Sequence, residues 1–472
     1  MFEPVIAPSG TLLGLLQRGR GDGTLHALTA PRAEALAALD HCVLRDPRHD
    51  WQVENRSLYY ARLYLDLHGE LDAIEAHLFG AEDVLDTDEC RTGLALAVLG
   101  HLASYGRQDA LALLRRYAAS GANWAWALDE LALRDDDAGL RALAVPVLAR
   151  FPADAEGEAD LTAAVRDAFE PRPWRLWAED PRPAVGARVR AAQEAGSFDR
   201  WQRQMRPQGP RPGWSVQAVF DWAQQGLERG AVLHVPAARC LTAVAGPENR
   251  HEIVEAARAG GDGARCTALR YLADSDDPDA LDLVEAAVST GSALVVDAAV
   301  DAFERMRGVA AVDRARGWAR RPDALGAAAG RVLACRGGAQ DRDLVLAALR
   351  EAVRGEGPDA QTLWTLVDGA GRLGIACAAP VLRHVYRETA SSHLRGRAAR
   401  ALAATDPSFA AGFAVECLWD CEESTREIAA RHAETGDTRV VDQLRRLAAD
   451  PAEEAEVQTA VRSRIGPDMP AV

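Results

Sequence analysis

The sequence predicts an all-α fold, an α-solenoid in which antiparallel helix pairs stack on one another. Composition is the first reason: Ala, Leu and Arg are abundant, and aromatic residues make up only 6% of the chain. These frequent residues rank high in helix propensity, whereas strand-forming residues are scarce. The second reason is a pattern of two apolar helices that recurs about every thirty residues, which is typical of helical solenoids.

The recurrence is clearest in the last third of the chain. The segments "RGRAARALAATDP" (395–407) and "TREIAARHAETGDTRVVDQLRRLAAD" (425–450) both open with Arg and small apolar residues. In the longer segment a turn and a second apolar helix follow. Similar segments occupy residues 264–288 and 327–349. Each unit of this kind buries its apolar face only against its neighbours, so several must stack.

These segments resemble the HEAT-repeat family, in particular the short HEAT-like repeats of phycobiliprotein lyases. The resemblance covers about residues 264–450 and is weaker over 94–150. It implies a superhelix that binds a partner on its concave surface, and it also brings in bilin attachment or removal as a third function. Three features carry it: a helix that ends at Leu373-Gly374, a helix that opens at Ala379-Pro380-Val381-Leu382, and a repeat that opens with Arg395, Ala398 and Ala399.

The changes in composition divide the chain into three segments. We expect an N-terminal helical-repeat array over 1–151 and a C-terminal HEAT-like array over 214–472. Between them, residues 152–213 are rich in Pro, Arg and Trp. Proline ends and punctuates helices, so this middle segment is predicted to be an irregular connector with short helices.

A dinucleotide-binding motif is imitated by Gly369, Gly371 and Gly374, which have the spacing GxGxxG. A true motif of this kind follows a strand and opens a helix. Here the apolar residues from Leu363 to Leu373 recur with the helix period and run through the glycines. We therefore predict a helix that ends at Gly374 in left-handed geometry, and no nucleotide site.

The segment 170–214 is the most unusual part of the chain. It carries nine Arg, five acidic residues, seven Pro and four Trp. Arg interleaved with aromatic residues stacks on bases, pairs with phosphates or pairs with an acidic protein. The alternative is a connector whose Trp side chains dock on flanking helices. If the segment binds a partner, the contact residues are Arg172, Trp174, Arg175, Trp177, Trp201, Arg203, Arg206 and Trp214.

Two further clusters combine aromatic and polar residues. In "NWAWALDELAL" (123–133), Trp124 or Trp126 is expected to pack between repeats, because large aromatic residues dominate packing. A weaker alternative is similarity to HEAT-like DNA glycosylases of the AlkD type, which use Trp and Asp to hold a damaged base. In residues 45–67, Arg56 and Tyr60 share one helix face, and we expect this segment to cap the N-terminal end of the solenoid.

Several chemistries have no support in the sequence. All 54 basic residues are Arg, which excludes Schiff-base catalysis and the phosphate-binding Lys of P-loops. "DSDDPDALDLVE" (274–285) imitates a calcium loop but has Asp279 where the turn needs Gly, so a helix cap is the better interpretation. The scattered histidines show no zinc spacing. We expect no metal, no cofactor and no catalytic residue.

The net charge of −16 disfavours nucleic acid and anionic membranes as partners. The sequence therefore favours a non-enzymatic scaffold or regulator that binds another protein, through an extended or basic segment of that protein. Nucleic-acid binding through 170–214 is the alternative. No apolar stretch of about 18 residues occurs, and the cysteines show no CxxC pairing. We therefore expect a cytoplasmic location.

Overall fold

The computed structural model describes residues 6–47, 56–85, 89–204 and 213–465. Every regular element in these ranges is a helix, which confirms the predicted all-α class. None of the helices described is long and apolar enough to cross a membrane. The chain forms two compact units. Unit 1 comprises residues 1–206, 387–399 and 408–472, and unit 2 comprises 207–386 and 400–407.

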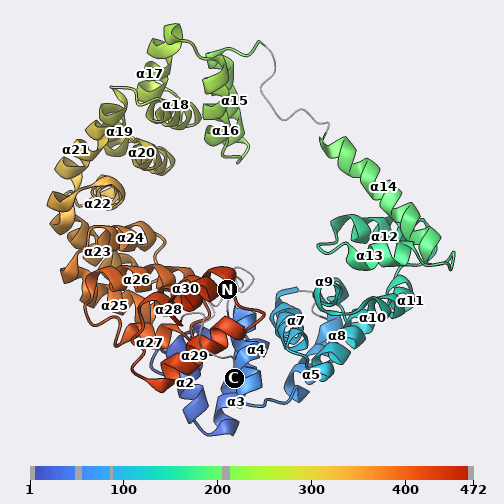
Figure 1. The fold of residues 1–472 in the computed structure, drawn as a ribbon. Helices are drawn as coiled ribbons and strands as arrows, with labels where there is room; N and C mark the ends of the chain where they lie inside the picture. The colour runs from blue at the N-terminus through green and yellow to red at the C-terminus, as the bar shows by residue number, and fades with distance from the viewer. Residues whose placement is uncertain (1–5, 48–55, 86–88, 205–212, 466–472) are drawn as a thin grey trace. The chain divides into compact units, whose positions relative to one another are not determined.

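Unit 2 is a succession of helices joined by short turns (Figure 1). Its described elements include three short 3-10 helices, η1, η2 and η3. Its elements are α15 (Val216–Glu228), α16 (His234–Val244), η1 (Pro247–Asn249), α17 (Arg250–Ala259), α18 (Asp262–Asp274), α19 (Ala280–Thr290), α20 (Ala293–Arg305), α21 (Val309–Trp318), α22 (Ala324–Arg336), η2 (Ala339–Asp341), α23 (Arg342–Glu356), α24 (Leu363–Arg372), η3 (Ala376–Ala378) and α25 (Ala379–Glu388).

Alternate helices of unit 2 stack in a layer. Helix α18 packs against both α16 and α20, and α22 packs against both α20 and α24. The helices between them pack on this layer, as α17 does on α18 and α23 does on α22 and α24. Each helix therefore buries its apolar face against the helices before and after it, which is the packing expected of a solenoid.

Arginine side chains join successive helix pairs of unit 2. Arg270 pairs with Asp301 at 2.8 Å, and Arg305 pairs with Asp274 at 2.8 Å. Farther along, the Arg342 guanidinium donates a hydrogen bond of 2.8 Å to the carbonyl oxygen of Leu373. All three contacts connect residues about thirty positions apart, which is the spacing of the sequence pattern.

The glycine motif lies in α24 and the turn after it, with no strand before it. Leu363, Leu366 and Val367 are buried on one face of this helix. Gly374 follows the helix with φ of +60°, a left-handed conformation that suits glycine. The predicted helix and its glycine end are confirmed, and the context of a dinucleotide-binding turn is absent from this described segment.

The glycine at 369 has a packing role that a substitution can test. A Cβ there would overlap with Ala334 of α22, so Gly369→Ala should destabilise unit 2 by about 1–3 kcal/mol through overpacking. Gly355→Ala in α23 is the matched control, because nothing lies within 4 Å of its Cβ position and Ala favours helix. Urea denaturation followed by circular dichroism measures both. Equal stability of the two variants would contradict the close approach of α22 and α24.

Unit 1 contains helices from both ends of the chain. From the N-terminal side come α1 (Leu12–Gln17), α2 (Gly21–Thr29), α3 (Arg32–Leu44), α4 (Arg56–Asp66), α5 (Asp72–Leu78), α6 (Glu82–Leu85), α7 (Glu89–Ser104), α8 (Gln108–Ser120), α9 (Trp124–Arg134), α10 (Asp137–Ala142), α11 (Ala144–Leu148), α12 (Ala155–Asp167), α13 (Arg172–Ala178) and α14 (Gly186–Gln204). From the C-terminal side come α27 (Phe413–Cys417), α28 (Glu423–His432), α29 (Thr438–Ala449) and α30 (Ala455–Ile465), and α26 (Ser392–Thr405) contributes its first half.

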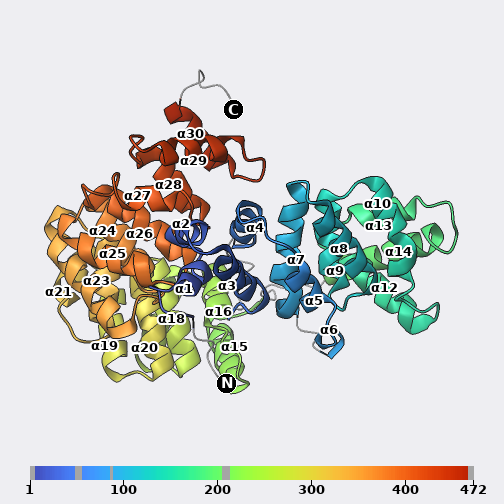
Figure 2. The same ribbon diagram turned by 90° about the horizontal axis from the view of Figure 1, so that it is seen from below.

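Helices from the N-terminal and C-terminal segments of the chain meet in unit 1, where helix α2 packs against α27 (Figures 1 and 2). The Cys421 amide donates a hydrogen bond of 2.9 Å to the carbonyl oxygen of Gly19. Gly19 has φ of +67°, and a Cβ on it would clash with the Cys421 side chain. A Cβ at Gly21 would overlap with the carbonyl oxygen of Glu416. Both glycines therefore permit the close approach of the two ends.

This pairing changes the interpretation of residues 45–67. Arg56 and Tyr60 are fully buried, and the Tyr60 hydroxyl donates a hydrogen bond of 3.0 Å to the carbonyl oxygen of Leu16. Residues 48–55 lie outside the described ranges. Helix α4 does not lie at a free end of the unit, because the C-terminal segment contacts it: Asp66 of α4 pairs with Arg446 of α29 at 2.6 Å.

The segments expected at 1–151, 152–213 and 214–472 differ from the two units. Residues 155–204 form three helices that pack on one another, and α13 also packs on α9 and α10. One proline that suggested irregular structure, Pro173, lies in the first turn of α13, where proline is compatible with a helix. The remaining part of the expected connector, 205–212, lies outside the described residues.

Candidate functional site

Two of the tryptophans proposed for partner binding lie in the core of unit 1. Trp174 is 3% exposed and Trp177 is fully buried. The Trp177 indole N–H donates a hydrogen bond of 2.8 Å to the carbonyl oxygen of Leu140. The Trp174 ring meets Trp124 edge to face, with ring centroids 6.4 Å apart. These two side chains are therefore packing residues. This agrees with the interpretation of 170–214 as a connector whose tryptophans dock on flanking helices.

The two nearby arginines differ in their surroundings. The Arg172 guanidinium donates hydrogen bonds to the carbonyl oxygens of Ala132 at 2.7 Å and Asp135 at 3.0 Å, and it pairs with Asp137 at 2.6 Å. Arg172 thus satisfies the last carbonyls of α9, as a cation at a helix C-terminus should. Arg175, in contrast, is exposed on α13.

The other four candidate residues lie between residues 201 and 214. The side chains of Trp201 and Arg203, and the whole of Arg206, lie outside the part of the chain that the structure describes. Trp214 belongs to unit 2, where it meets Trp222 edge to face with ring centroids 5.5 Å apart. Among the described residues of the set, only Arg175 presents a well-exposed side chain beside the helices of unit 1.

A cavity of about 530 Å³ lies on α9, in the sequence NWAWALDELAL. We call it the α9 cavity. Trp124 turns away from it and packs against Phe151 and Trp174, which confirms the predicted packing role for that residue. The α9 cavity is lined by Ala97, Trp126, Asp129, Glu130, Leu133, Phe169 and Glu170.

The helix period explains how α9 builds this cavity. Trp126, Asp129, Glu130 and Leu133 are spaced i, i+3, i+4 and i+7, so they share one helix face. Helix α7 closes one side, and it approaches closely because a Cβ on its Gly100 would overlap with the Glu130 carboxylate.

The turn between α12 and α13 closes another side of the cavity. The Glu170 amide donates a hydrogen bond of 3.0 Å to Asp129 Oδ1, which ties this turn to α9. The tie leaves two large apolar side chains on the surface: Phe169 is 81% exposed and Leu133 is 60% exposed. Few large apolar residues of the described chain are so exposed, and their position at the rim of a cavity indicates a contact surface.

The carboxylates of the α9 cavity are held in unusual states. Burial raises the pKa of Glu130 to about 7, although Arg134, at 2.6 Å, and a hydrogen bond from Trp126 favour its charged form. Burial also raises the pKa of Asp129 to about 6, and the negative charge of Glu170 adds to this rise. Acidic groups with raised pKa values in a cavity are typical of functional sites.

These raised values predict a variant that gains stability. Because the pKa of Asp129 is higher in the folded chain than its ordinary 3.8, its contribution to stability is present at low pH and is lost as the pH rises through about 6. Asp129→Asn should therefore stabilise the protein by about 1 kcal/mol at pH 8, after allowance for partial exposure, and by less at pH 5. Urea denaturation at both pH values measures this. The exposed Glu179→Gln is the control, and an equal gain at both pH values would contradict the assignment.

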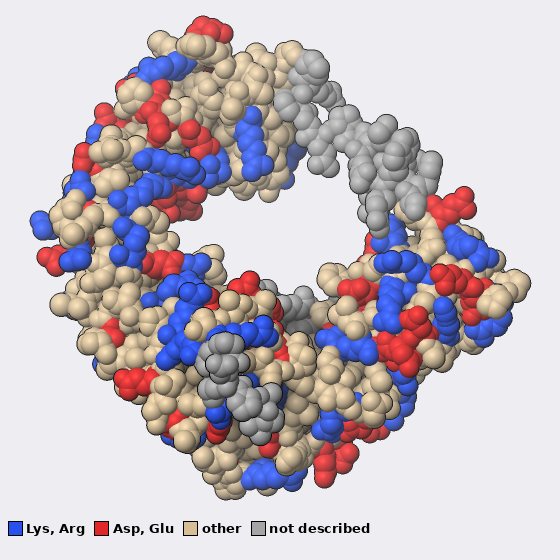
Figure 3. Space-filling model, viewed as in Figure 1, with Lys and Arg blue, Asp and Glu red and all other residues tan. Residues whose placement is uncertain are grey.

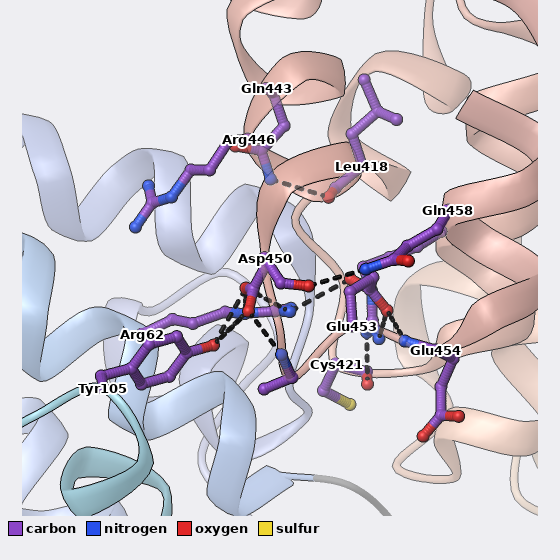
Figure 4. A network of polar contacts seen from close by, with 12 residues as sticks. Arg62, Tyr105, Leu418, Cys421, Gln443, Arg446, Asp450, Glu453, Glu454 and Gln458 are labelled. Carbon is purple, nitrogen blue, oxygen red and sulfur yellow. Dashed lines mark hydrogen bonds and ion pairs between the residues drawn. The ribbon is translucent and has the colours of Figure 1, made fainter. Parts of the chain in front are cut away.

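A second polar cluster joins the N-terminal and C-terminal segments of unit 1 (Figure 4). Arg62 of α4 pairs with Asp450 at 2.8 Å and with Glu453 at 3.1 Å. The Tyr105 hydroxyl donates to the Asp450 carboxylate at 2.9 Å. Arg426 of α28 pairs with Glu453 at 2.7 Å. We call this set the terminal junction.

The terminal junction is a structural contact and leaves little room for a ligand. Its charges are matched, since Arg426 and Arg62 hold the pKa of the buried Glu453 below its ordinary value even though burial acts the other way. The hollow beside it, between Tyr59 and Arg446, has a volume of only about 30 Å³, enough for a water or two. The sequence pattern gave no signal of it, because Arg62 and Glu453 are hundreds of residues apart.

The described residues include no group of three or more His, Cys, Asp or Glu side chains placed to hold a metal ion. In the sequence that imitates a calcium loop, the N-cap residue of α19 is Asp279, which follows Pro278, and not Asp277, which precedes that proline. The Asp279 carboxylate does not bond the helix amides, however, and pairs with Arg250 at 2.8 Å. Asp277 pairs with the same arginine at 2.7 Å.

No protein-family model matches the chain, and no curated protein matches it. The function must therefore be argued from the site itself. The α9 cavity is the part of the described structure that combines volume, exposed apolar side chains and acidic groups.

Proposed function

We propose that this chain is a non-enzymatic scaffold or regulator that binds another protein through a basic segment of that protein. The observation that carries the proposal is the α9 cavity, where Phe169 and Leu133 are exposed beside the carboxylates of Asp129 and Glu170. Exposed apolar side chains next to charges of one sign are typical of interaction surfaces. The resemblance to HEAT-like repeats supports the same function, because stacked helix pairs offer long surfaces to their partners.

Nucleic-acid binding has weaker support. The α9 cavity is acidic and repels phosphates, and the chain as a whole has a net charge of −16. Of the aromatic residues that would stack on bases, Trp174 and Trp177 are buried. On the face seen in Figure 3, arginine and acidic side chains are intermixed over both units. A strong phosphate-binding surface would instead gather positive charge on one face.

The test is capture of the partner by the full-length protein. Immobilised protein is incubated with lysate of its own cells, with and without nuclease, and the bound proteins are identified by mass spectrometry. We expect one protein in comparable amount, indifferent to nuclease, whose purified form then binds directly. Recovery that disappears with nuclease, and falls steeply with salt, would overturn the proposal in favour of nucleic-acid binding.

A further inference from the structure

We infer that the α9 cavity is a receptor for one arginine or lysine side chain of the partner protein, with its cationic head between Asp129 and Glu170 and its aliphatic stem on the apolar rim. This inference rests on the proposed function and adds to it a site and a chemical class of ligand.

Two acids of the α9 cavity have no cation to pair with among the described residues. Asp129 and Glu170 lie close enough for their charges to interact, yet within the described residues neither forms an ion pair. Asp135 and Asp420, two buried acids of unit 1, pair with Arg115 and Arg395, whereas Asp129 and Glu170 are half-buried. Two neighbouring carboxylates without a counter-charge attract a cation, and a guanidinium can bond both.

Glu130 is the third acid of the cavity. It already has its own cation, Arg134, at 2.6 Å, and Trp126 also donates a hydrogen bond to it. Glu130 therefore lines the cavity but does not serve as an acceptor for a further cation. This leaves Asp129 and Glu170 as the acceptors for a cation from outside.

The rim of the cavity carries two exposed apolar side chains. Phe169 is 81% exposed and Leu133 is 60% exposed, and both face a cavity whose volume of about 530 Å³ lies in the range of ligand sites. Lysine and arginine side chains bury their stems on apolar surface while the charged head meets polar groups. An aromatic ring next to the head adds a cation–π contact. The rim thus suits the same residue whose head fits the two carboxylates.

The experiment measures binding of a fluorescent acetylated pentapeptide, Gly-Ala-Arg-Ala-Gly, to the full-length protein by anisotropy at pH 8. The matched probes replace the central arginine by lysine or by citrulline, its neutral analogue. We expect the arginine and lysine peptides to bind and the citrulline peptide to bind at least tenfold more weakly. Equal binding of the citrulline peptide would overturn the inference.

Variants of the protein locate the site. Asp129→Asn combined with Glu170→Gln should weaken arginine-peptide binding at least tenfold. Phe169→Ala, whose exposed ring contributes little to folding, should weaken it several-fold. Glu179→Gln, an exposed acid outside the cavity, should change nothing. Circular dichroism checks that each variant is folded. Full peptide binding by the double variant would overturn the inference.

Two further outcomes separate the inference from the proposed function. If the double variant captures the cellular partner as well as the unaltered protein does, the scaffold function stands and the α9 cavity is not its receptor. If instead the cavity variants abolish binding of a fluorescent single-stranded oligonucleotide, the cavity serves nucleic acid and the inference fails.

Discussion

Replacing Arg426 with alanine is expected to destabilise unit 1 by about 3–5 kcal/mol, because it leaves a buried carboxylate without its main counter-charge. Arg426 is 1% exposed and Glu453 is 7% exposed. Two hydrogen bonds of 2.7 and 2.9 Å join the guanidinium to the Glu453 carboxylate. The same guanidinium also donates to the carbonyl oxygens of Asp420 and Cys421, both at 2.7 Å.

Urea denaturation followed by circular dichroism measures the effect. The matched control is Arg439→Ala, since Arg439 pairs with Asp437 on the surface and such pairs add little to stability. A second comparison separates charge from packing. The double variant Arg426→Met with Glu453→Met removes both charges and should recover much of the lost stability. A single variant as stable as the Arg439 control would show that the pair is not buried in solution.

The sequence predicted the class of fold because helix periodicity is a local property. The face of α24 and the left-handed Gly374 follow from residues within one helix and its end. Arg395 and Arg426 were also visible as members of a repeated pattern. Their role was not, because Asp420 and Glu453, which neutralise them in the core, carry no mark of that pairing in the sequence.

Only some of the residues that line the α9 cavity stand together in the sequence. Trp126, Asp129 and Glu130 stand in one short motif whose helical spacing places them on a single face. Phe169 and Glu170 come from a segment about forty residues later. Only the folded chain brings that turn to α9, through the hydrogen bond from the Glu170 amide to Asp129. Long-range contacts of this kind leave no periodic signal in a single sequence.

Proline density is a weak guide to where helices end, for a physical reason. The sequence predicted an irregular connector with short helices over 152–213, and the described part contains α12, α13 and α14, the last of which runs from Gly186 to Gln204. Proline breaks a helix only in its interior, where it removes a hydrogen bond and clashes with the preceding turn. Pro173 lies in the first turn of α13, where the amide is free in any case, and the tryptophans after it secure this helix in the core.

Ending the chain after residue 436 is expected to destabilise unit 1 more than any single substitution in it. This change removes α29 and α30, and with them both carboxylates that pair with Arg62. It also leaves Arg426 buried without Glu453. Since the helices of each repeat bury their apolar faces against neighbours, loss of the last pair exposes the apolar face of α28 as well.

The readout is hydrogen exchange measured by mass spectrometry on the shortened and full-length chains. We expect faster exchange in α28, which loses α30, and also in α4, hundreds of residues away, which loses its ion pairs. Helices α18 to α22 of unit 2 should exchange as before. A chain that ends after residue 465 is the control, because it keeps α30 and the terminal junction. Unchanged exchange in α4 would contradict the junction, because a helix whose partly buried Arg62 has lost both acidic partners cannot remain as stable as before.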